Sequence, residues 1–147
     1  MIWQYHDGGR ADAGRKGNTG DCVTRALAIA MRRPYEDVYA DLAAGTATQR
    51  ASKRTPKKGR TASRGINTRR KWFTLYMLER GWRWVPTMGI GTGCRVHLRD
   101  GELPMGRLIA AVSRHYCAVI DGVVHDTADP SRGGTRCVYG YWTEEQA

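Results

Sequence analysis

The chain has 147 residues, 41% of them hydrophobic, which predicts a single domain large enough to bury an apolar core. A formal net charge of +10 indicates an anionic partner or high solubility. The first residues lack the basic head and apolar run of a signal peptide, and no apolar stretch is long enough to span a bilayer. We therefore expect a cytoplasmic protein without membrane contact, whose cysteines stay reduced: Cys22, Cys94, Cys117 and Cys137.

The N-terminal region is predicted to lead into a buried helix. Residues 2–5 are expected to form a short strand or an anchored arm, followed by loop up to residue 20. At Cys22 this polar, glycine-containing approach gives way to an apolar pattern with helical spacing, which continues to Met31. Pro34 ends the helix. The cysteine should therefore lie in the first turn of the central helix, where free N–H groups and the helix dipole stabilise a thiolate.

Two more helices are predicted before residue 81. One begins at Pro34 and ends at Gly45. The other runs from Thr68 to about Arg80, with Asn67 as its N-cap. The side chains expected on its inward face are Trp72, Leu75, Tyr76 and either Leu78 or Glu79.

A basic segment separates the second and third predicted helices. Residues 48–71 contain ten Lys or Arg and no acid. Residues 48–65 are too polar to offset their ordering entropy, so we expect a mobile loop that makes weak, salt-sensitive contact with polyanions such as nucleic acid. The side chains expected to make this contact are Arg50, Lys53, Arg54, Lys57, Lys58, Arg60 and Arg64.

The second half of the chain is predicted to be an antiparallel sheet. Short β-rich runs separated by Gly, Pro and Asp occupy residues 82–85, 94–98, 107–112, 115–120, 123–127 and 137–142. Helices followed by strands indicate an α+β fold, with helices on one side of a sheet of about five strands. Cys94, His97, Cys117, His125 and Cys137 are metal-binding residue types, but no paired motif accompanies Cys94 and His97, so neither a metal nor a cofactor is expected.

The dipeptide Asp121-Gly122 predicts a tight hairpin that brings His115 and Asp126 together. A two-residue type I′ turn pairs Ile120 with Val123, which places His115 and Asp126 on one face and close enough for an imidazole–carboxylate hydrogen bond. Asp129 falls on the other face and is held in reserve as the acid.

This order of a cysteine opening a buried helix, a histidine on a later strand and an acid on the next strand resembles the papain-like cysteine hydrolases. The resemblance implies a nucleophilic Cys22, a general base His115 and an orienting Asp126, which would cleave an amide, isopeptide or thioester in a protein or peptide through an acyl-enzyme. The family places a Gln before its cysteine, and none stands there, so Asn18 or Thr19 together with the Cys22 N–H would bind the oxyanion. The segment from His125 to Trp142 is similar to small phage-encoded proteins of unassigned function, which implies a bacterial host cytoplasm.

Other interpretations of the same residues remain open. Cys22 can be a buried apolar side chain, His115 a hydrogen-bonded sheet histidine and Asp126 a turn residue. The chain would then be an inactive scaffold that binds nucleic acid or protein through its basic surface. A third possibility is an acyltransferase that uses the same triad on an amine acceptor.

Overall fold

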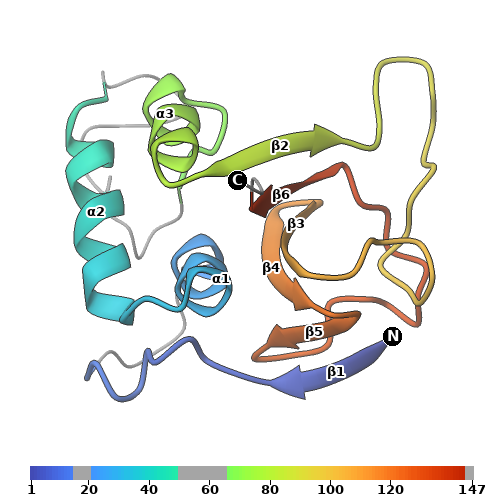
Figure 1. Ribbon diagram of the computed structural model, residues 1–147, viewed down its shortest axis with the longest axis horizontal. Helices are drawn as coiled ribbons and strands as arrows, with labels where there is room; N and C mark the ends of the chain where they lie inside the picture. Colours follow the sequence, from blue (N-terminus) through green and yellow to red (C-terminus); the bar gives the residue numbers. More distant parts are fainter. Residues whose placement is uncertain (15–20, 50–65, 145–147) are drawn as a thin grey trace.

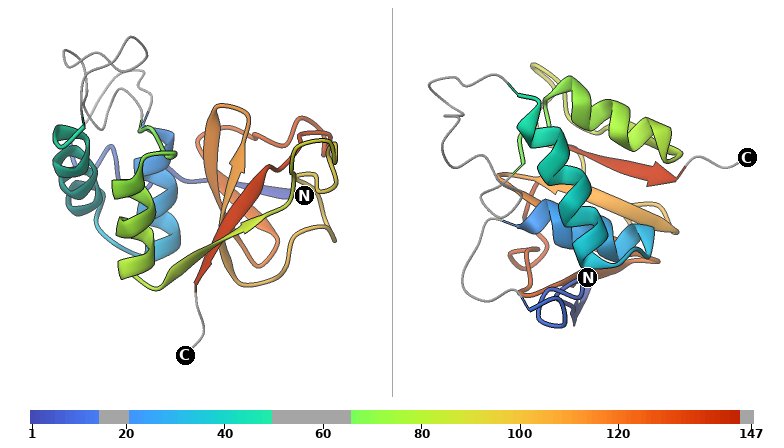
Figure 2. Two further views of the ribbon diagram at one scale, coloured as in Figure 1. Left: turned by 90° about the horizontal axis from the view of Figure 1, so that it is seen from above. Right: turned by 90° about the vertical axis from the view of Figure 1, so that its left-hand side faces the viewer.

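The computed structural model describes residues 1–14, 21–49 and 66–144. Its elements are β1 (Ile2–Tyr5), α1 (Cys22–Met31), α2 (Tyr35–Ala47), α3 (Lys71–Glu79), β2 (Trp82–Pro86), β3 (Arg107–Val112), β4 (His115–Ile120), β5 (Val123–Asp126) and β6 (Gly140–Glu144). The helices gather on one side of the sheet (Figure 1, Figure 2), which confirms the α+β class. None of the helices described is long and apolar enough to cross a bilayer.

The strands form one mixed sheet in the order β1-β5-β4-β3-β6-β2. All neighbouring strands are antiparallel except β1, which runs parallel to β5 and pairs Ile2 with Val123. The five strands of the second half are antiparallel as predicted, and β1 adds a sixth, parallel strand that was not expected in this sheet. The strand predicted over residues 2–5 forms, but its partner lies 121 positions later in the chain, and local patterns do not reveal such a pairing.

The hairpin between β4 and β5 has the predicted register. Ile120 pairs with Val123, and Ala118 pairs with His125. Asp121 and Gly122 have φ values of 49° and 80°, and a type I′ turn requires φ to be positive at both positions. The hairpin therefore brings the end of β5 back to the start of β4.

An apolar core lies between the helices and the sheet. Phe73 of α3 is fully buried, and its ring centroid lies 6.2 Å from that of Tyr116 and 6.0 Å from that of Trp142. Burying a side chain of this kind stabilises the fold by roughly 1.5–3 kcal/mol. Other fully buried members of this core are Leu27, Val38, Leu42, Met77, Ile109 and Ala118.

Helix α3 differs from its prediction in start and orientation. It begins at Lys71 rather than Thr68, because Asn67 caps a preceding turn by accepting the Arg69 N–H at 3.1 Å. Its buried residues are Phe73, Tyr76 and Met77, whereas Leu75 and Leu78 are 46% and 51% exposed. The prediction is confirmed for Tyr76 and in part for Trp72, which packs against the core, and is wrong for Leu75 and Leu78. The adjacent Trp72 and Phe73 permit two apolar stripes, and packing against the sheet selects between them.

A second core covers the opposite face of the sheet. Leu98, Leu103 and Val138, from the segments that connect the strands, pack against the β3, β4 and β5 side chains that point away from the helices. The segment predicted as a strand over 94–98 forms only an isolated bridge between His97 and Cys137. Likewise β6 begins at Gly140, three residues later than predicted.

A disulfide joins Cys94 and Cys137 across this second layer. The expectation that all four cysteines are reduced is therefore corrected for this pair, while Cys22 and Cys117 carry free thiols. Hydrogen bonds from Val138 N–H to the Val96 carbonyl oxygen and from Leu98 N–H to the Arg136 carbonyl oxygen hold the two segments side by side. The resulting Cα–Cα distance of 5.9 Å suits a disulfide.

Candidate active site

Cys22 is the first residue of α1, and its side chain is half-buried at the sheet-facing side of the helix. The helix starts here because the apolar pattern begins here, and Asp21 occupies the N-cap position. The N–H groups of a first helical turn have no partner within the helix, so they present positive charge to the sulfur. This placement agrees with the prediction.

His115 and Asp126 are brought together by the β4–β5 hairpin. His115 is the first residue of β4 and Asp126 the last residue of β5. Nε2 of His115 lies 2.5 Å from Oδ2 of Asp126, which is 5% exposed. With Nε2 engaged by the carboxylate, Nδ1 is the ring nitrogen left to face the Cys22 sulfur, to which the histidine is also hydrogen-bonded.

The charges of the three groups stabilise one another. Burial alone would raise the pKa of the Cys22 thiol, but the hydrogen bond and positive charge of His115 outweigh it and lower that pKa. Burial alone would lower the pKa of His115, but its bonds to Asp126 and Cys22 raise it to about 9. Burial would likewise raise the pKa of Asp126, yet the His115 bond and charge lower it. The arrangement favours a thiolate beside an imidazolium.

Two further groups that lower the pKa of the Cys22 thiol were not found by sequence reasoning. The backbone N–H of Tyr116 donates to the Cys22 sulfur and helps to lower the thiol pKa. The guanidinium of Arg25, one helical turn along α1, adds favourable charge. The first contact depends on the α1–β4 packing and has no sequence signal.

Arg25 also belongs to a buried ion network behind the triad. One guanidinium nitrogen lies 3.5 Å from Asp126 Oδ1, and the other contacts Asp21, whose carboxylate is 1% exposed. The carboxylate of Asp21 further accepts the Tyr35 hydroxyl at 2.6 Å and lies 3.3 Å from Arg10 Nε. The i, i+4 spacing of Asp21 and Arg25 is the signal that could have found this link.

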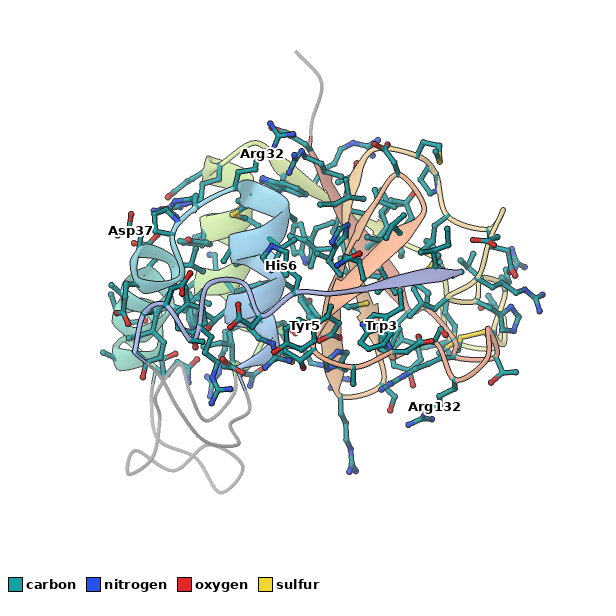
Figure 3. The ribbon with its side chains drawn as sticks, turned by 90° about the horizontal axis from the view of Figure 1, so that it is seen from below. Trp3, Tyr5, His6, Arg32, Asp37 and Arg132 are labelled. Carbon is teal, nitrogen blue, oxygen red and sulfur yellow. A yellow bond between two sulfur atoms is a disulfide. The ribbon has the colours of Figure 1, made fainter. Side chains whose placement is uncertain are left out.

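The edge strand β1 and the residue that follows it hold Asp126 through its backbone. The Trp3 indole N–H and the His6 backbone N–H each donate to the Asp126 carbonyl oxygen at 3.0 Å. Trp3, Tyr5 and His6 follow one another along this edge of the sheet (Figure 3). The Thr127 N–H donates to Asp126 Oδ1 at 2.7 Å. The acid is thereby held through both its backbone and its side chain.

The remaining predicted site residues lie away from the imidazole or outside the described residues. Asp129 lies apart from the imidazole contact, since its Oδ1 accepts the Ser131 N–H at 3.0 Å in a turn. Asn18 and Thr19, predicted for the oxyanion, lie outside the described residues. The same holds for all seven predicted polyanion contacts, namely Arg50, Lys53, Arg54, Lys57, Lys58, Arg60 and Arg64, and for most of the predicted mobile loop.

A cavity of about 790 Å³ opens beside the sulfur, and we call it the Cys22 cavity. It is bordered by Cys22, His115, the cationic Arg69 and Arg114, and a group of apolar side chains that includes residues of β2, β6 and their loops. The chemistry available here is attack of a thiolate on a bound carbonyl carbon, with an imidazolium ready to donate a proton. Within the described ranges, no three His, Cys, Asp or Glu side chains are grouped so as to hold a metal ion.

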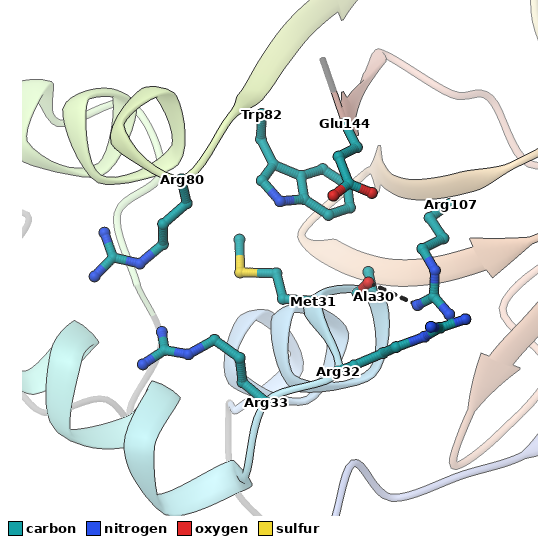
Figure 4. A pocket seen from close by; sticks show the side chains of 8 residues that line it. All are labelled: Ala30, Met31, Arg32, Arg33, Arg80, Trp82, Arg107 and Glu144. Carbon is teal, nitrogen blue, oxygen red and sulfur yellow. Dashed lines mark hydrogen bonds between the residues drawn. The ribbon is translucent and has the colours of Figure 1, made fainter. Parts of the chain in front are cut away.

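A separate cavity of about 300 Å³, which we call the Arg107 cavity, lies at the other end of α1. Figure 4 shows the four arginines that line it, Arg32, Arg33, Arg80 and Arg107, around Met31. Asp41 accepts hydrogen bonds from Arg33 at 2.6 Å and from Arg80 at 3.5 Å. Arg107 donates to the Ala30 carbonyl oxygen at 2.9 Å. The acidic group in the lining is Glu144, so this surface is predominantly positive.

No protein-family model, no curated protein and no solved structure matches this chain.

Proposed function

We propose that this protein is a papain-like cysteine hydrolase that cleaves an amide, isopeptide or thioester bond. The observation that carries the proposal is that Cys22 and His115 line one cavity while His115 is bonded to the Asp126 carboxylate, and the pKa of the Cys22 thiol is lowered by His115. If Cys22 were only a buried apolar side chain, an imidazolium beside it would serve no purpose. If His115 were only a sheet histidine hydrogen-bonded to Asp126, a thiolate beside it would serve none either. The lowered pKa of Cys22 and the raised pKa of His115 match what a nucleophile and its acid–base partner require.

The proposed reaction has two chemical steps. The Cys22 thiolate attacks the substrate carbonyl carbon, and the resulting oxyanion collapses as the carbon–nitrogen bond breaks and His115 gives its proton to the leaving nitrogen. The product is a thioester on Cys22. A water molecule then gives a proton to His115 and attacks the thioester carbonyl, which releases the acid and restores the thiolate. Asp126 keeps the imidazole oriented in both steps. Either first-turn N–H groups of α1 or the Tyr116 N–H would be placed near the oxyanion.

Selective alkylation tests the proposal directly. With limiting iodoacetamide near pH 6, Cys22 should react ahead of Cys117, which is 1% exposed and whose pKa is raised by burial. His115→Ala should slow the reaction of Cys22 by removing its ion-pair partner, whereas His97→Ala, remote from α1, should not. If Cys22 reacts no faster than Cys117, or is indifferent to His115→Ala, the hydrolase proposal falls.

The Arg107 cavity favours a second candidate function, which is binding of polyanions such as nucleic acid. Arg33 and Arg80 are bonded to Asp41. The other two arginines of the cavity, Arg32 and Arg107, can therefore bind phosphate oxygens. Binding of a single-stranded oligonucleotide should weaken steeply with salt. Arg32→Gln should weaken it further, while Arg83→Gln, an exposed arginine on β2 outside this lining, serves as the matched control. Salt-independent binding, or equal effects of both substitutions, would exclude this use of the cavity.

A further inference from the structure

Two cavities with different linings meet at His115. The Cys22 cavity lies on one side of the imidazole. On the other side lies a cavity of about 570 Å³ bordered by Asp126 and the loop after β5, which we call the Arg132 cavity. His115 and Arg114 border both. A substrate that lies across the catalytic groups therefore meets two different surfaces, one on each side of the scissile bond.

Part of the wall of the Cys22 cavity is an exposed apolar cluster, while Arg69 and Arg114 belong to the rest of the lining. Trp84, Met88 and Tyr139 form this cluster, and they are 38%, 37% and 39% exposed although large apolar side chains are usually buried. Gly140 lies directly against the Trp84 ring, where a Cβ atom would collide with the indole. The Trp84 ring is thus packed in place on one side and open to the cavity on the other. Such a cluster is typical of a surface that receives an apolar group.

The Arg132 cavity is predominantly positive. It is lined by Arg114, Arg132 and Arg136, and the first two are exposed. Arg132 stands on the outer side of the loop that follows β5 (Figure 3). The carboxylates nearby are already engaged, since Asp126 bonds to His115 and Asp129 accepts a backbone N–H. Arg136 donates to the carbonyl oxygens of Ser113 and Pro130, so Arg114 and Arg132 are the better placed to meet an anionic ligand.

The chemistry of the proposed reaction assigns each cavity to one half of the substrate. The leaving nitrogen takes its proton from His115, so the leaving half of the substrate must lie on the side of the imidazole. The acyl half remains bonded to Cys22 and extends along the Cys22 cavity. We propose that the site accepts a peptide with an apolar, preferably aromatic, residue on the acyl side of the scissile bond and acidic residues on the leaving side. This inference rests on the proposed function for its direction.

Binding of two peptides to the Cys22→Ala variant tests this polarity without turnover. The capped peptides Phe-Gly-Asp-Asp and Asp-Asp-Gly-Phe have the same composition and charge, so attraction to the basic chain as a whole cancels between them. Isothermal titration calorimetry should show the first binding about tenfold more tightly, which corresponds to one good charge-assisted contact. Equal affinity, preference for the second peptide, or no binding of either would overturn the inference.

Substitution of the two exposed arginines tests the basic half. Arg114 and Arg132 have φ values of 56° and 52°, and asparagine tolerates this conformation better than most residues. In the Cys22→Ala background, Arg114→Asn with Arg132→Asn should abolish the preference, and Arg132→Asn alone should reduce it. Arg83→Gln removes one exposed charge outside both cavities and should leave the preference unchanged. A preference that survives the double substitution in a folded protein would contradict the assignment.

Hydrolysis of the same peptides by the unaltered protein separates the two proposals. Preferential binding without cleavage of either peptide, together with Cys22 alkylation that is indifferent to His115→Ala, would refute the hydrolase and leave the polarity of the surface standing. Cleavage of both peptides at equal rates, with equal binding, would leave the hydrolase standing and refute the polarity.

Discussion

Replacing Asp126 by asparagine should lower the pKa of His115 substantially. The value of about 9 lies about 2.5 pH units above the ordinary 6.5, which corresponds to roughly 3.4 kcal/mol in favour of the imidazolium. Burial opposes this, and the bond to Asp126 is the first of the interactions that raise the pKa. An amide keeps the shape of the carboxylate without its charge, so in Asp126→Asn only Cys22 would oppose burial. We expect the pKa of His115 to fall by at least about 1.

Titration of the histidine ring protons by NMR measures this change. His125 provides a contrast, since burial keeps its pKa below the ordinary value. Turnover should follow the same shift, because His115 must be protonated to serve the leaving group. The alkaline limb of kcat/KM should therefore move from about pH 9 towards neutrality. An unchanged His115 titration in Asp126→Asn would refute the reasoning that the carboxylate controls this imidazole.

Three further predictions concern the apolar core around Phe73, the Cys94–Cys137 disulfide and the Asp126 carboxylate. Phe73→Ala should lower the free energy of unfolding by about 3–5 kcal/mol in urea denaturation, while the exposed Leu75→Ala should change it little. Thiol titration of the unfolded protein should find two free thiols before reduction and four after it, and four before reduction would exclude the Cys94–Cys137 bond. The pKa of Asp126 is lowered in the folded protein, so this carboxylate contributes stability above its ordinary pKa of 3.8, and that stability is lost as the pH falls through the folded pKa. The free energy of unfolding should therefore drop below about pH 4. The drop should be smaller in Asp126→Asn.

Local sequence signals predicted the parts of the site that depend on short-range geometry. The start of α1 at Cys22 follows from the switch to helical spacing, and the approach of Asp126 to His115 follows from the turn at Asp121-Gly122. The catalytic use of these residues stays a prediction. Their geometry was predictable because each depends on fewer than about 15 neighbouring residues, over which propensity and periodicity act.

Contacts between distant segments were not predictable in this way. The parallel pairing of β1 with β5, the disulfide from Cys94 to Cys137 and the Tyr116 N–H bond to Cys22 each join segments that are far apart in the sequence. The compartment argument for reduced cysteines failed for one pair because packing of two loops, rather than cysteine spacing, brought those sulfurs together. The ion pair of Arg25 with Asp21 lies between these two cases. The i, i+4 spacing can be read from the sequence, but the burial of the pair cannot.

The chain order of the triad has a consequence for synthesis. Cys22 leaves the ribosome 93 residues before His115 and 104 before Asp126, and β1, which bonds to the Asp126 carbonyl, leaves before all three. Until the C-terminal strands arrive, the nascent chain has a cysteine without its imidazolium, so the thiol keeps ordinary reactivity. At about 5–20 residues per second this interval lasts about 5–20 s. If Cys22 is the nucleophile proposed above, its activated thiol would form only when the sheet closes on α1, and an incomplete chain would not carry it.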